Sequence, residues 1–200
     1  MADIYQQYRG LRGWVAAEVI TDTDEKYECG TPFPIAGLAE VSKSTESSSE
    51  GYYYDNKLAG SNDTTGADEI TFSSAAIPDE AYAKITGQYY DEATGMLVEG
   101  SRESKYFAVG YITKKTDGTE IFVWRLKGKF SIPSSTHTTE DDGAEGNGQE
   151  VTFTGGETVH KFTKNGKCAR AVNVDTSVNA VSEEEFFGTV QTPDTVKASV

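Results

Sequence analysis

The chain has 200 residues and a formal net charge of −14, with 32 acidic against 18 basic side chains. This length suffices for one domain with a sizeable core and is short for two, so we expect a single domain over residues 1–200. The acidic balance argues against a specific nucleic-acid binder, because such proteins hold phosphates with clustered lysines and arginines. It is typical either of a protein kept dispersed at high concentration or of a surface that DNA passes without sticking.

The sequence indicates neither membrane insertion nor export. No stretch reaches the run of about 18 apolar residues that a membrane helix needs. Residues 1–5 lack a basic segment followed by an apolar one, so we expect no signal peptide and synthesis in a cytoplasm. Cys29 and Cys168 lie outside any CxxC pair, which gives a zinc site no support. One disulfide is possible, but two buried thiols in a reducing compartment are the favoured interpretation.

The composition favours β-structure. The 11 Tyr and 9 Phe suit a pleated, half-buried surface, and 20 Gly against 5 Pro suit tight turns between strands. In chain order, residues 13–20 predict a strand that follows a flexible N-terminal segment, 1–12. Residues 21–25 predict a polar turn, 26–29 pair back against the strand, and the prolines of 30–34 keep that stretch extended.

A long hairpin is predicted over residues 40–58. Alternation from Ala36 keeps an apolar face only at its start, residues 44–50 are purely polar, and β character resumes at 51–59. A tip that projects from the body cannot bury its aromatic residues in its own core, so its tyrosines become contact residues for another chain. The open alternative is an ordinary mobile loop with partly exposed tyrosines. The candidate contact residues are Lys43, Ser44, Glu46, Tyr52, Tyr53 and Tyr54.

The middle of the chain contains the strongest helix signal. Residues 60–66 predict a loop, and residues 68–74 alternate as a strand does. A helix is predicted over residues 78–87, because a proline and two acidic residues open the segment and a glycine closes it. Residues 88–100 predict a short hairpin.

The clearest local unit is a hairpin over residues 106–130. Its turn contains Asp117-Gly118, a strong two-residue hairpin signal. Both strands are apolar on both faces near their middles, so this hairpin should be central in its sheet. An acidic, glycine-rich loop is predicted over residues 138–149.

The last part of the chain predicts two more strands, one helical turn and a flexible tail. These strands cover residues 150–162 and 167–174. One helical turn is predicted over residues 182–187, where Ser182 and Glu185 resemble a capping box. Residues 192–200 are expected to be a frayed, flexible tail.

No catalytic or metal-binding constellation is evident. The sequence has no phosphate-binding glycine loop before a helix, no HExxH, no EF-hand spacing and no GxSxG. His137 is expected in a loop, and His160 as a strand residue rather than a general base. The acidic runs 140–142 and 183–185 could bind calcium weakly, but solvated charge is the favoured interpretation. We therefore expect no enzyme, no metal and no cofactor.

Four segments share their pattern with a known family. They are residues 106–115 (YFAVGYITKK), 122–130 (FVWRLKGKF), the helix region 77–87 and the C-terminal segment 186–191 (FFGTVQ). Together they resemble the major tail (tail tube) proteins of bacteriophages with long non-contractile tails. Arg125 stands where an apolar or aromatic residue is common in that family. The resemblance covers about residues 36–193, and the residues before them contribute little.

The resemblance implies a mainly β fold, a β-sandwich or β-barrel-like tail-tube domain with one flanking α-helix and a long protruding hairpin. Subunits of this kind form hexameric rings that stack into a tube, with four strands per subunit contributing to a barrel around the lumen. The hairpin 40–58 would contact a neighbouring ring or subunit. The lumen would hold the tape-measure protein and later pass DNA, and other tail proteins would bind the tube ends. Such subunits are made in the host bacterial cytoplasm and end in the virion.

Two other classes of protein share these features. A monomeric β-sandwich binding or adhesion module has similar aromatic strands and acidic charge, but it is usually exported. Another tube-forming protein, such as a tail terminator or a secretion-system tube subunit, would share the fold. Only assembly behaviour or genomic neighbours would separate that class from a tail tube subunit.

Overall fold

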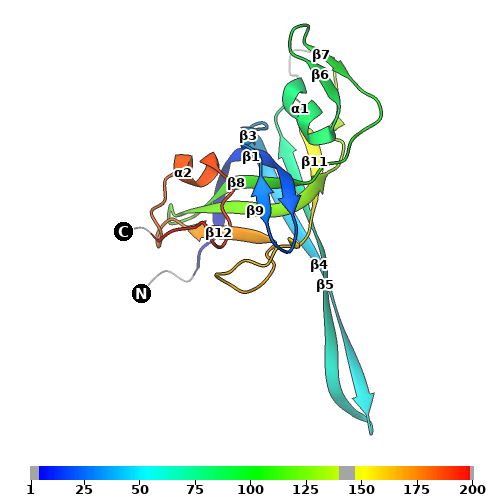
Figure 1. The fold of residues 1–200 in the computed structure, drawn as a ribbon, viewed down its shortest axis with the longest axis vertical. Helices are drawn as coiled ribbons and strands as arrows, with labels where there is room; N and C mark the ends of the chain where they lie inside the picture. Colours follow the sequence, from blue (N-terminus) through cyan, green and yellow to red (C-terminus); the bar gives the residue numbers. More distant parts are fainter. Residues whose placement is uncertain (1–4, 140–146, 199–200) are drawn as a thin grey trace.

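The computed structural model describes residues 5–139 and 147–198, and these residues fold mainly as β-structure, with 52% of them in strands and 7% in helices. The main sheet has the strand order β2-β1-β8-β9-β11-β5-β4, with β3 beside β1, β10 beside β11 and β12 beside β9 (Figure 1). Its strands are β1 (Tyr8–Asp22), β2 (Tyr27–Cys29), β3 (Phe33–Pro34), β4 (Leu38–Tyr54), β5 (Lys57–Ser74), β8 (Phe107–Lys115), β9 (Glu120–Phe130), β10 (Ser134–Ser135), β11 (Gln149–Gly155) and β12 (Ala171–Asp175).

The remaining elements lie outside this sheet. Strands β6 (Tyr89–Asp91) and β7 (Met96–Val98) form a separate two-stranded sheet. The helices are α1 (Asp79–Thr86) and the shorter α2 (Glu183–Gly188). The predicted mainly β fold with a flanking helix is confirmed.

The hairpin of β8 and β9 is buried on both faces, as the sequence predicted. On one face, Val123 joins a core cluster that also holds Trp14 and Phe72, whose rings stack with centroids 4.9 Å apart. On the other face, Trp124 joins a second cluster with Phe186 of α2. The Trp124 indole Nε1 donates a hydrogen bond of 3.0 Å to the Phe186 carbonyl, which fixes α2 against the sheet. The central hairpin therefore supports two apolar layers.

Both predicted helical segments are confirmed. Helix α1 starts directly after Pro78 and ends at Gly87, which adopts a left-handed conformation with φ 70°. At the start of α2, the Ser182 side chain accepts a hydrogen bond of 3.2 Å from the backbone N–H of Glu185.

Three predicted segments differ from the structure. Residues 60–66, expected as a loop, belong to β5, because β4 pairs with them along the whole length of the hairpin. The strand predicted over 150–162 ends at Gly155, and His160 lies outside any strand. After this end, the Thr158 N–H donates to the Ala169 carbonyl, and the Asp22 carboxylate accepts the backbone N–H groups of Val159 and His160, so these residues bond outside the β11 ladder. The strand predicted over 167–174 is likewise shorter, because β12 begins only at Ala171.

The two terminal segments expected to be flexible have contacts in the structure. Strand β1 already begins at Tyr8. Near the C-terminus, the Asp194 carboxylate accepts backbone hydrogen bonds of 2.9 Å from Thr163 and 2.7 Å from Lys164. Thr192 is buried, so these contacts differ from the frayed tail predicted from this residue.

Candidate functional site

The hairpin of β4 and β5 leaves the body as a two-stranded ribbon, whose residues 46–66 we call the arm (Figure 1). Strand β5 pairs with β11 only over residues 68–74, so within the described residues the two arm strands have only each other as strand partners. A rise of about 3.3 Å per residue gives the arm a reach of roughly 30 Å. Its Asp55-Asn56 turn has positive φ at both positions (50° and 61°), which matches the right-handed twist of a hairpin.

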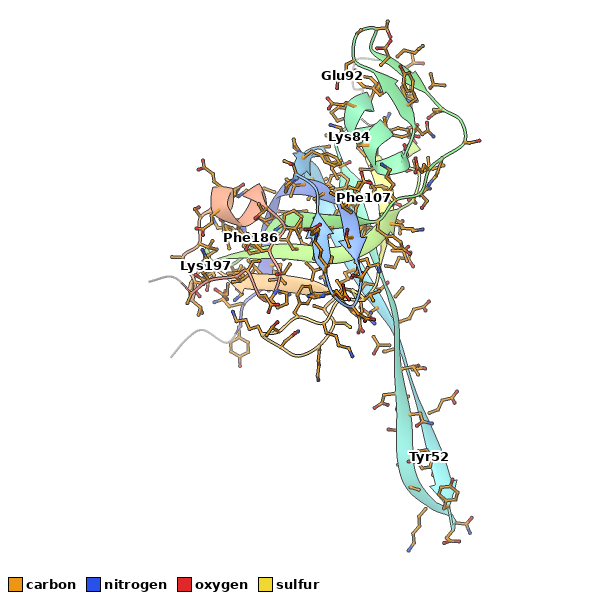
Figure 2. The ribbon with its side chains drawn as sticks, viewed as in Figure 1. Tyr52, Lys84, Glu92, Phe107, Phe186 and Lys197 are labelled. Atoms are coloured by element: carbon orange, nitrogen blue, oxygen red, sulfur yellow. The ribbon has the colours of Figure 1, made fainter. Side chains whose placement is uncertain are left out.

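The arm carries its apolar side chains at the tip. The rings of Tyr52 and Tyr54 meet edge to face with centroids 5.9 Å apart, and Tyr54 is 70% exposed (Figure 2). Tyr52 lies across Gly60, where an added Cβ would come within 2.4 Å of the tyrosine hydroxyl. This face of the tip therefore presents aromatic surface that nothing in the described residues covers.

The opposite face of the tip is also apolar. Tyr53 and Leu58 are cross-strand partners, and a Cβ at Gly51 would lie 2.9 Å from Leu58 Cδ1. Tyr53 and Leu58 are both exposed. An isolated two-stranded hairpin is marginally stable in water, and exposed aromatic surface of this kind is typical of an interface.

The other predicted contact residues lie where the arm meets the body. Lys43 lies 3.5 Å from the carboxylate of Asp68, and Ser44 pairs with Glu69 in the ladder. Glu46 follows directly, at a register shift of the β4–β5 pairing. The candidate residues thus divide into a group at the base and a group at the tip, and their role in contacts between subunits stays a prediction.

The base of the arm contains a nearly buried carboxylate, Asp68, whose side chain is only 5% exposed. Three cations surround it, with nitrogen–oxygen distances of 3.5 Å to Lys43, 3.7 Å to Arg125 and 3.6 Å to Arg170, and the Thr45 hydroxyl donates a hydrogen bond of 2.6 Å. Burial acts to raise the pKa of Asp68, but the hydrogen bond and the positive charges outweigh it, so the pKa is lowered. The group is therefore ionised at neutral pH.

Arg170 connects this carboxylate to the backbone at the base of the arm. Its Nη1 donates a hydrogen bond of 2.6 Å to the Gly66 carbonyl, and its Nε lies 3.2 Å from Glu157. One residue of this cluster is conspicuous in the sequence: Arg125, which breaks an otherwise apolar strand, is a counterion of Asp68. Nothing in the sequence marked Asp68 or Arg170, because their partners are distant along the chain.

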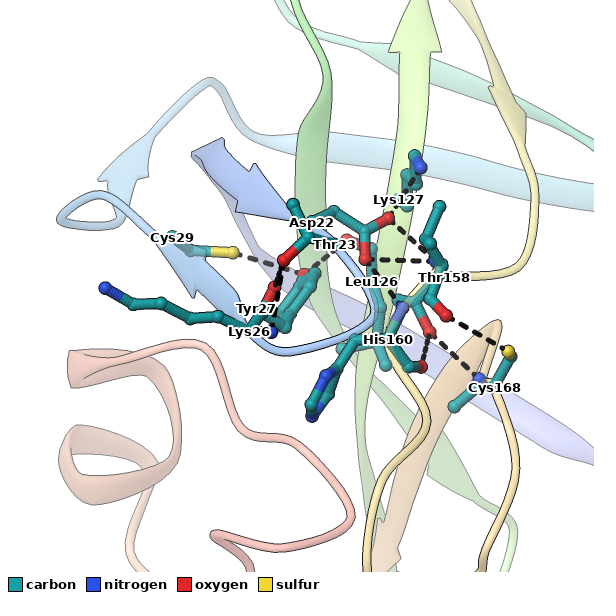
Figure 3. A network of polar contacts seen from close by, with 12 residues as sticks. Asp22, Thr23, Lys26, Tyr27, Cys29, Leu126, Lys127, Thr158, His160 and Cys168 are labelled. Carbon is teal, nitrogen blue, oxygen red and sulfur yellow. Dashed lines mark hydrogen bonds and ion pairs between the residues drawn. The ribbon is translucent and has the colours of Figure 1, made fainter.

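A second polar network fixes the turn between β1 and β2 (Figure 3). Lys127 Nζ lies 2.5 Å from the Asp22 carboxylate, which also accepts the two backbone N–H groups described above. Burial acts to raise the pKa of Asp22, but the hydrogen bonds from Lys127 and from the backbone outweigh it and lower the pKa. This network joins β1 to β9 and to residues 156–162, so its role is structural.

The two cysteines are free thiols as favoured from the sequence, but both are partly buried rather than buried. Cys29 lies beside Tyr27, with 3.1 Å between its Sγ and the tyrosine hydroxyl, and that hydroxyl donates a hydrogen bond to the Leu126 carbonyl. Burial raises the pKa of the Cys29 thiol to about 11. The thiol is therefore protonated at neutral pH and unsuited to nucleophilic chemistry.

No candidate metal site is present in the described residues. They contain no group of three or more His, Cys, Asp or Glu side chains that could hold a metal ion. The acidic run 140–142 lies outside the described residues, and Glu183 of the other acidic run pairs with Arg12. No helix in the described part of the chain is long and apolar enough to span a membrane.

A cavity of about 680 Å³ lies beside α1. The lysines on its wall are each paired with a carboxylate, Lys84 with Glu80 at 2.5 Å and Lys105 with Glu18 at 3.1 Å. Each of these two lysines therefore has a carboxylate counterion on or near the cavity wall. The arm is therefore the most distinctive functional feature of the described structure.

Comparison with known proteins found a matching protein family. A family model described as "Phage tail tube protein" matches residues 23–190, a span that includes the whole arm, both helices and the central hairpin. A search of curated proteins gave no match.

Proposed function

The chain belongs to the phage tail tube protein family, whose members are structural components of the virion tail, and on this basis we propose that it forms hexameric rings that stack into the conduit for DNA ejection. The subunit is made in the host bacterial cytoplasm and joins a long non-contractile tail. In that tail the lumen holds the tape-measure protein before infection, and other tail proteins bind the two ends of the tube.

The observation that carries this proposal is the uncovered arm. A ribbon of this length, with apolar side chains on both faces of its tip, gains stability only when another chain covers it. The same hairpin lies within the span matched by the tail tube family. Lys43, Ser44 and Glu46 at its base and Tyr52, Tyr53 and Tyr54 at its tip are the proposed contact residues between subunits or rings.

Open strand edges support the closure of a ring. Within the described residues, β12 pairs only with β9, which leaves its other edge free. Free edges invite uncontrolled pairing, and a barrel closed across subunits removes them. A head-to-tail contact with a closing rotation gives a ring rather than an open filament.

The net charge of −14 supports the role as a conduit. A wall of negative charge offers phosphates no binding sites, and its repulsion reaches about 8 Å at physiological ionic strength. DNA can then move through the lumen without being held. The tape-measure protein, which leaves the lumen before the DNA, faces the same negatively charged wall.

Negative-stain electron microscopy of the purified protein over a concentration series tests this function. Rings, or hollow tubes with a lumen wide enough for a DNA duplex, are expected. A matched variant replaces residues 48–64 by an Asn-Gly turn between the ladder partners Ser47 and Thr65, which keeps the register and the base of the arm. This variant should fold and fail to form long tubes. Arm-truncated subunits that form tubes at the wild-type concentration would contradict the role of the arm. A wild-type chain that stays monomeric at every concentration would instead favour the monomeric binding module.

A further inference from the structure

The segment between β11 and β12 contains a turn with three exposed lysines, Lys161, Lys164 and Lys167, and we call residues 161–167 the basic turn. In a chain with a net charge of −14, copies repel one another over most of their surface. None of the three lysines forms an ion pair with another described residue. The basic turn is therefore a place where an acidic surface can approach.

The basic turn is held in one conformation by backbone hydrogen bonds. The Gly166 N–H donates to the Phe162 carbonyl at 2.8 Å, and the Phe162 N–H donates to the Lys167 carbonyl at 3.0 Å. The Asp194 carboxylate accepts two further backbone N–H groups of the turn, as described above. The Phe162 side chain is buried and anchors the turn in the body. A turn fixed in this way loses little conformational entropy when it binds.

The cavity of about 680 Å³ beside α1 carries the opposite charge. The charged residues on its wall are Glu18, Glu80, Glu92, Glu103, Lys84 and Lys105. Glu18 and Glu80 are the counterions of the two lysines. Glu92 and Glu103 are exposed, and neither pairs with a cation in the described part of the chain. The cavity therefore keeps two uncompensated negative charges.

The apolar part of the cavity wall suits the stem of a lysine. Ile20, Pro32 and Phe33 line it, and Ile20 is 66% exposed. A lysine lays its methylene chain along apolar surface and keeps its amine among polar groups. Lys84 of the cavity wall already does this, because its Nζ lies 5.2 Å from the centre of the Phe33 ring and pairs with Glu80. A lysine from another chain fits the same combination of surfaces.

Gln88 supplies an acceptor at the same wall. Its side-chain oxygen is buried and receives no hydrogen bond from any described residue. Its backbone N–H donates to the Ala83 carbonyl at 2.9 Å, so the residue is fixed beside α1. Buried polar atoms in native structures are nearly always paired, so an unpaired oxygen is a candidate acceptor for another molecule. An amine donor in the cavity would suit it.

The basic turn and the cavity lie on different sides of the body. Figure 1 shows α1 with β6 and β7 at one end, and the gold segment between β11 and β12 on the side from which the arm leaves. The turn therefore does not reach the cavity of its own chain. Two copies displaced along the long axis would bring the turn of one towards the cavity of the other, and such a head-to-tail contact repeats from copy to copy.

We propose that the basic turn of one subunit docks in the cavity beside α1 of the next copy along the tube, where its lysines face Glu92 and Glu103. The inference rests on the proposed tube and assigns a contact between the bodies of two subunits, separate from the arm. Opposite charges across an interface select the partner and its orientation, and the surrounding acidic surfaces disfavour other registers.

Charge reversal in the basic turn tests this docking. One variant combines Lys161→Glu with Lys167→Glu, and its control combines Arg9→Glu with Lys114→Glu, which makes the same change in net charge at two exposed basic residues elsewhere. Both variants should keep the wild-type melting temperature. The turn variant should raise the concentration needed for tube formation about tenfold or more, and the control should leave it unchanged. Tubes of the turn variant at the wild-type concentration, or an equal loss in the control, would overturn the proposed contact.

Reversal of the cavity charges supplies the matching measurement. Glu92→Lys with Glu103→Lys should also weaken tube formation. Adding these two substitutions to the turn variant should restore it, because every interface then regains opposite charges. A combined variant that assembles no better than the turn variant would overturn the pairing.

Zero-length cross-linking of amines to carboxylates tests the contact in the wild-type chain. Mass spectrometry should find residues 161–167 linked to Glu92 or Glu103 in assembled tubes and not in the monomer. Tubes whose basic turn is linked elsewhere on the neighbouring copy would overturn the assignment. Absence of tubes from the wild-type chain would count against the proposed function itself, so the two failures are distinguishable.

Discussion

Replacing Asp68 by Asn removes the negative charge at the base of the arm and keeps the shape of the side chain. The amide oxygen can still accept the hydrogen bond from Thr45, which is 2.6 Å long in the wild-type chain. The three cations within 3.5–3.7 Å lose their shared counterion. The substitution therefore tests the charge alone.

The expected loss is about 3 kcal/mol in the free energy of unfolding. Removing one partner of a buried ion pair costs roughly 3–5 kcal/mol, because it leaves the other charge uncompensated. The low end applies here, since the side chains of Lys43, Arg125 and Arg170 are 33%, 14% and 23% exposed and can turn towards water. For a chain of this size, that loss lowers the melting temperature by roughly 6–12 °C.

Thermal and urea unfolding of Asp68→Asn, with Asp63→Asn as the matched control, measure this loss. Asp63 lies exposed on the arm, so its replacement should change stability by no more than about 0.5 kcal/mol. The folded-state pKa of Asp68 lies below the ordinary value of 3.8. Its contribution is thus complete above pH 3.8 and is lost as the pH falls through the folded-state pKa. The stability curves of wild type and Asp68→Asn should converge in that acidic window.

Two results would refute this reasoning. If Asp68→Asn has the same free energy of unfolding as the wild type at pH 7, the ion pairs between the carboxylate and the cations do not stabilise the fold. If the difference between the two proteins persists unchanged well below pH 3.8, its origin is packing rather than charge.

Three further outcomes follow from particular contacts. Gly128→Ala should destabilise the fold by about 2–4 kcal/mol in urea unfolding, because the added Cβ would meet the Phe153 ring at 2.3 Å. The Cys29 thiol should react with maleimide at pH 8 far more slowly in the folded chain than in the urea-unfolded chain, since burial raises its pKa to about 11. Asp175 should titrate by NMR with a pKa of about 2, lowered by hydrogen bonds from Lys115 and Ser177. Lys115→Met should move that pKa back towards 3.8, and an unchanged value would contradict the role of the lysine.

Elements with local signals could be predicted from the sequence, and elements that depend on distant partners could not. The hairpin of β8 and β9 could be predicted from its Asp117-Gly118 turn and from the apolar residues on both faces of each strand. The arm was predicted only up to Leu58, because the polar, glycine-containing residues 60–66 are typical of a loop. Their strand conformation comes from the register with β4, which no local pattern encodes.

The candidate site divides in the same way. The tip tyrosines stand out in the sequence, because a run of aromatic residues follows a purely polar stretch. The cluster at the base does not, since Asp68 meets cations from β4, from β9 and from the segment before β12. Likewise, the segment that follows β11 is held by Asp22, which lies far back along the chain. The sequence therefore predicts the exposed tyrosines at the arm tip, whereas the ionic cluster at the base of the arm is visible only in the fold.

The arm tip is independent of the hydrophobic core of the subunit. The body buries its large aromatic residues in two clusters around β8 and β9, and the tip of the arm contributes to neither. The tip can therefore be shaped for a partner without a cost in subunit stability.

A freely swinging arm would lose conformational entropy at each docking event, about 1–2 kcal/mol for every backbone residue that becomes ordered. The ion pairs of Asp68 and the Arg170 hydrogen bond to Gly66 set the direction of the arm when the subunit folds. Docking then starts from a preorganised ribbon, which raises affinity without any further contact at the tip.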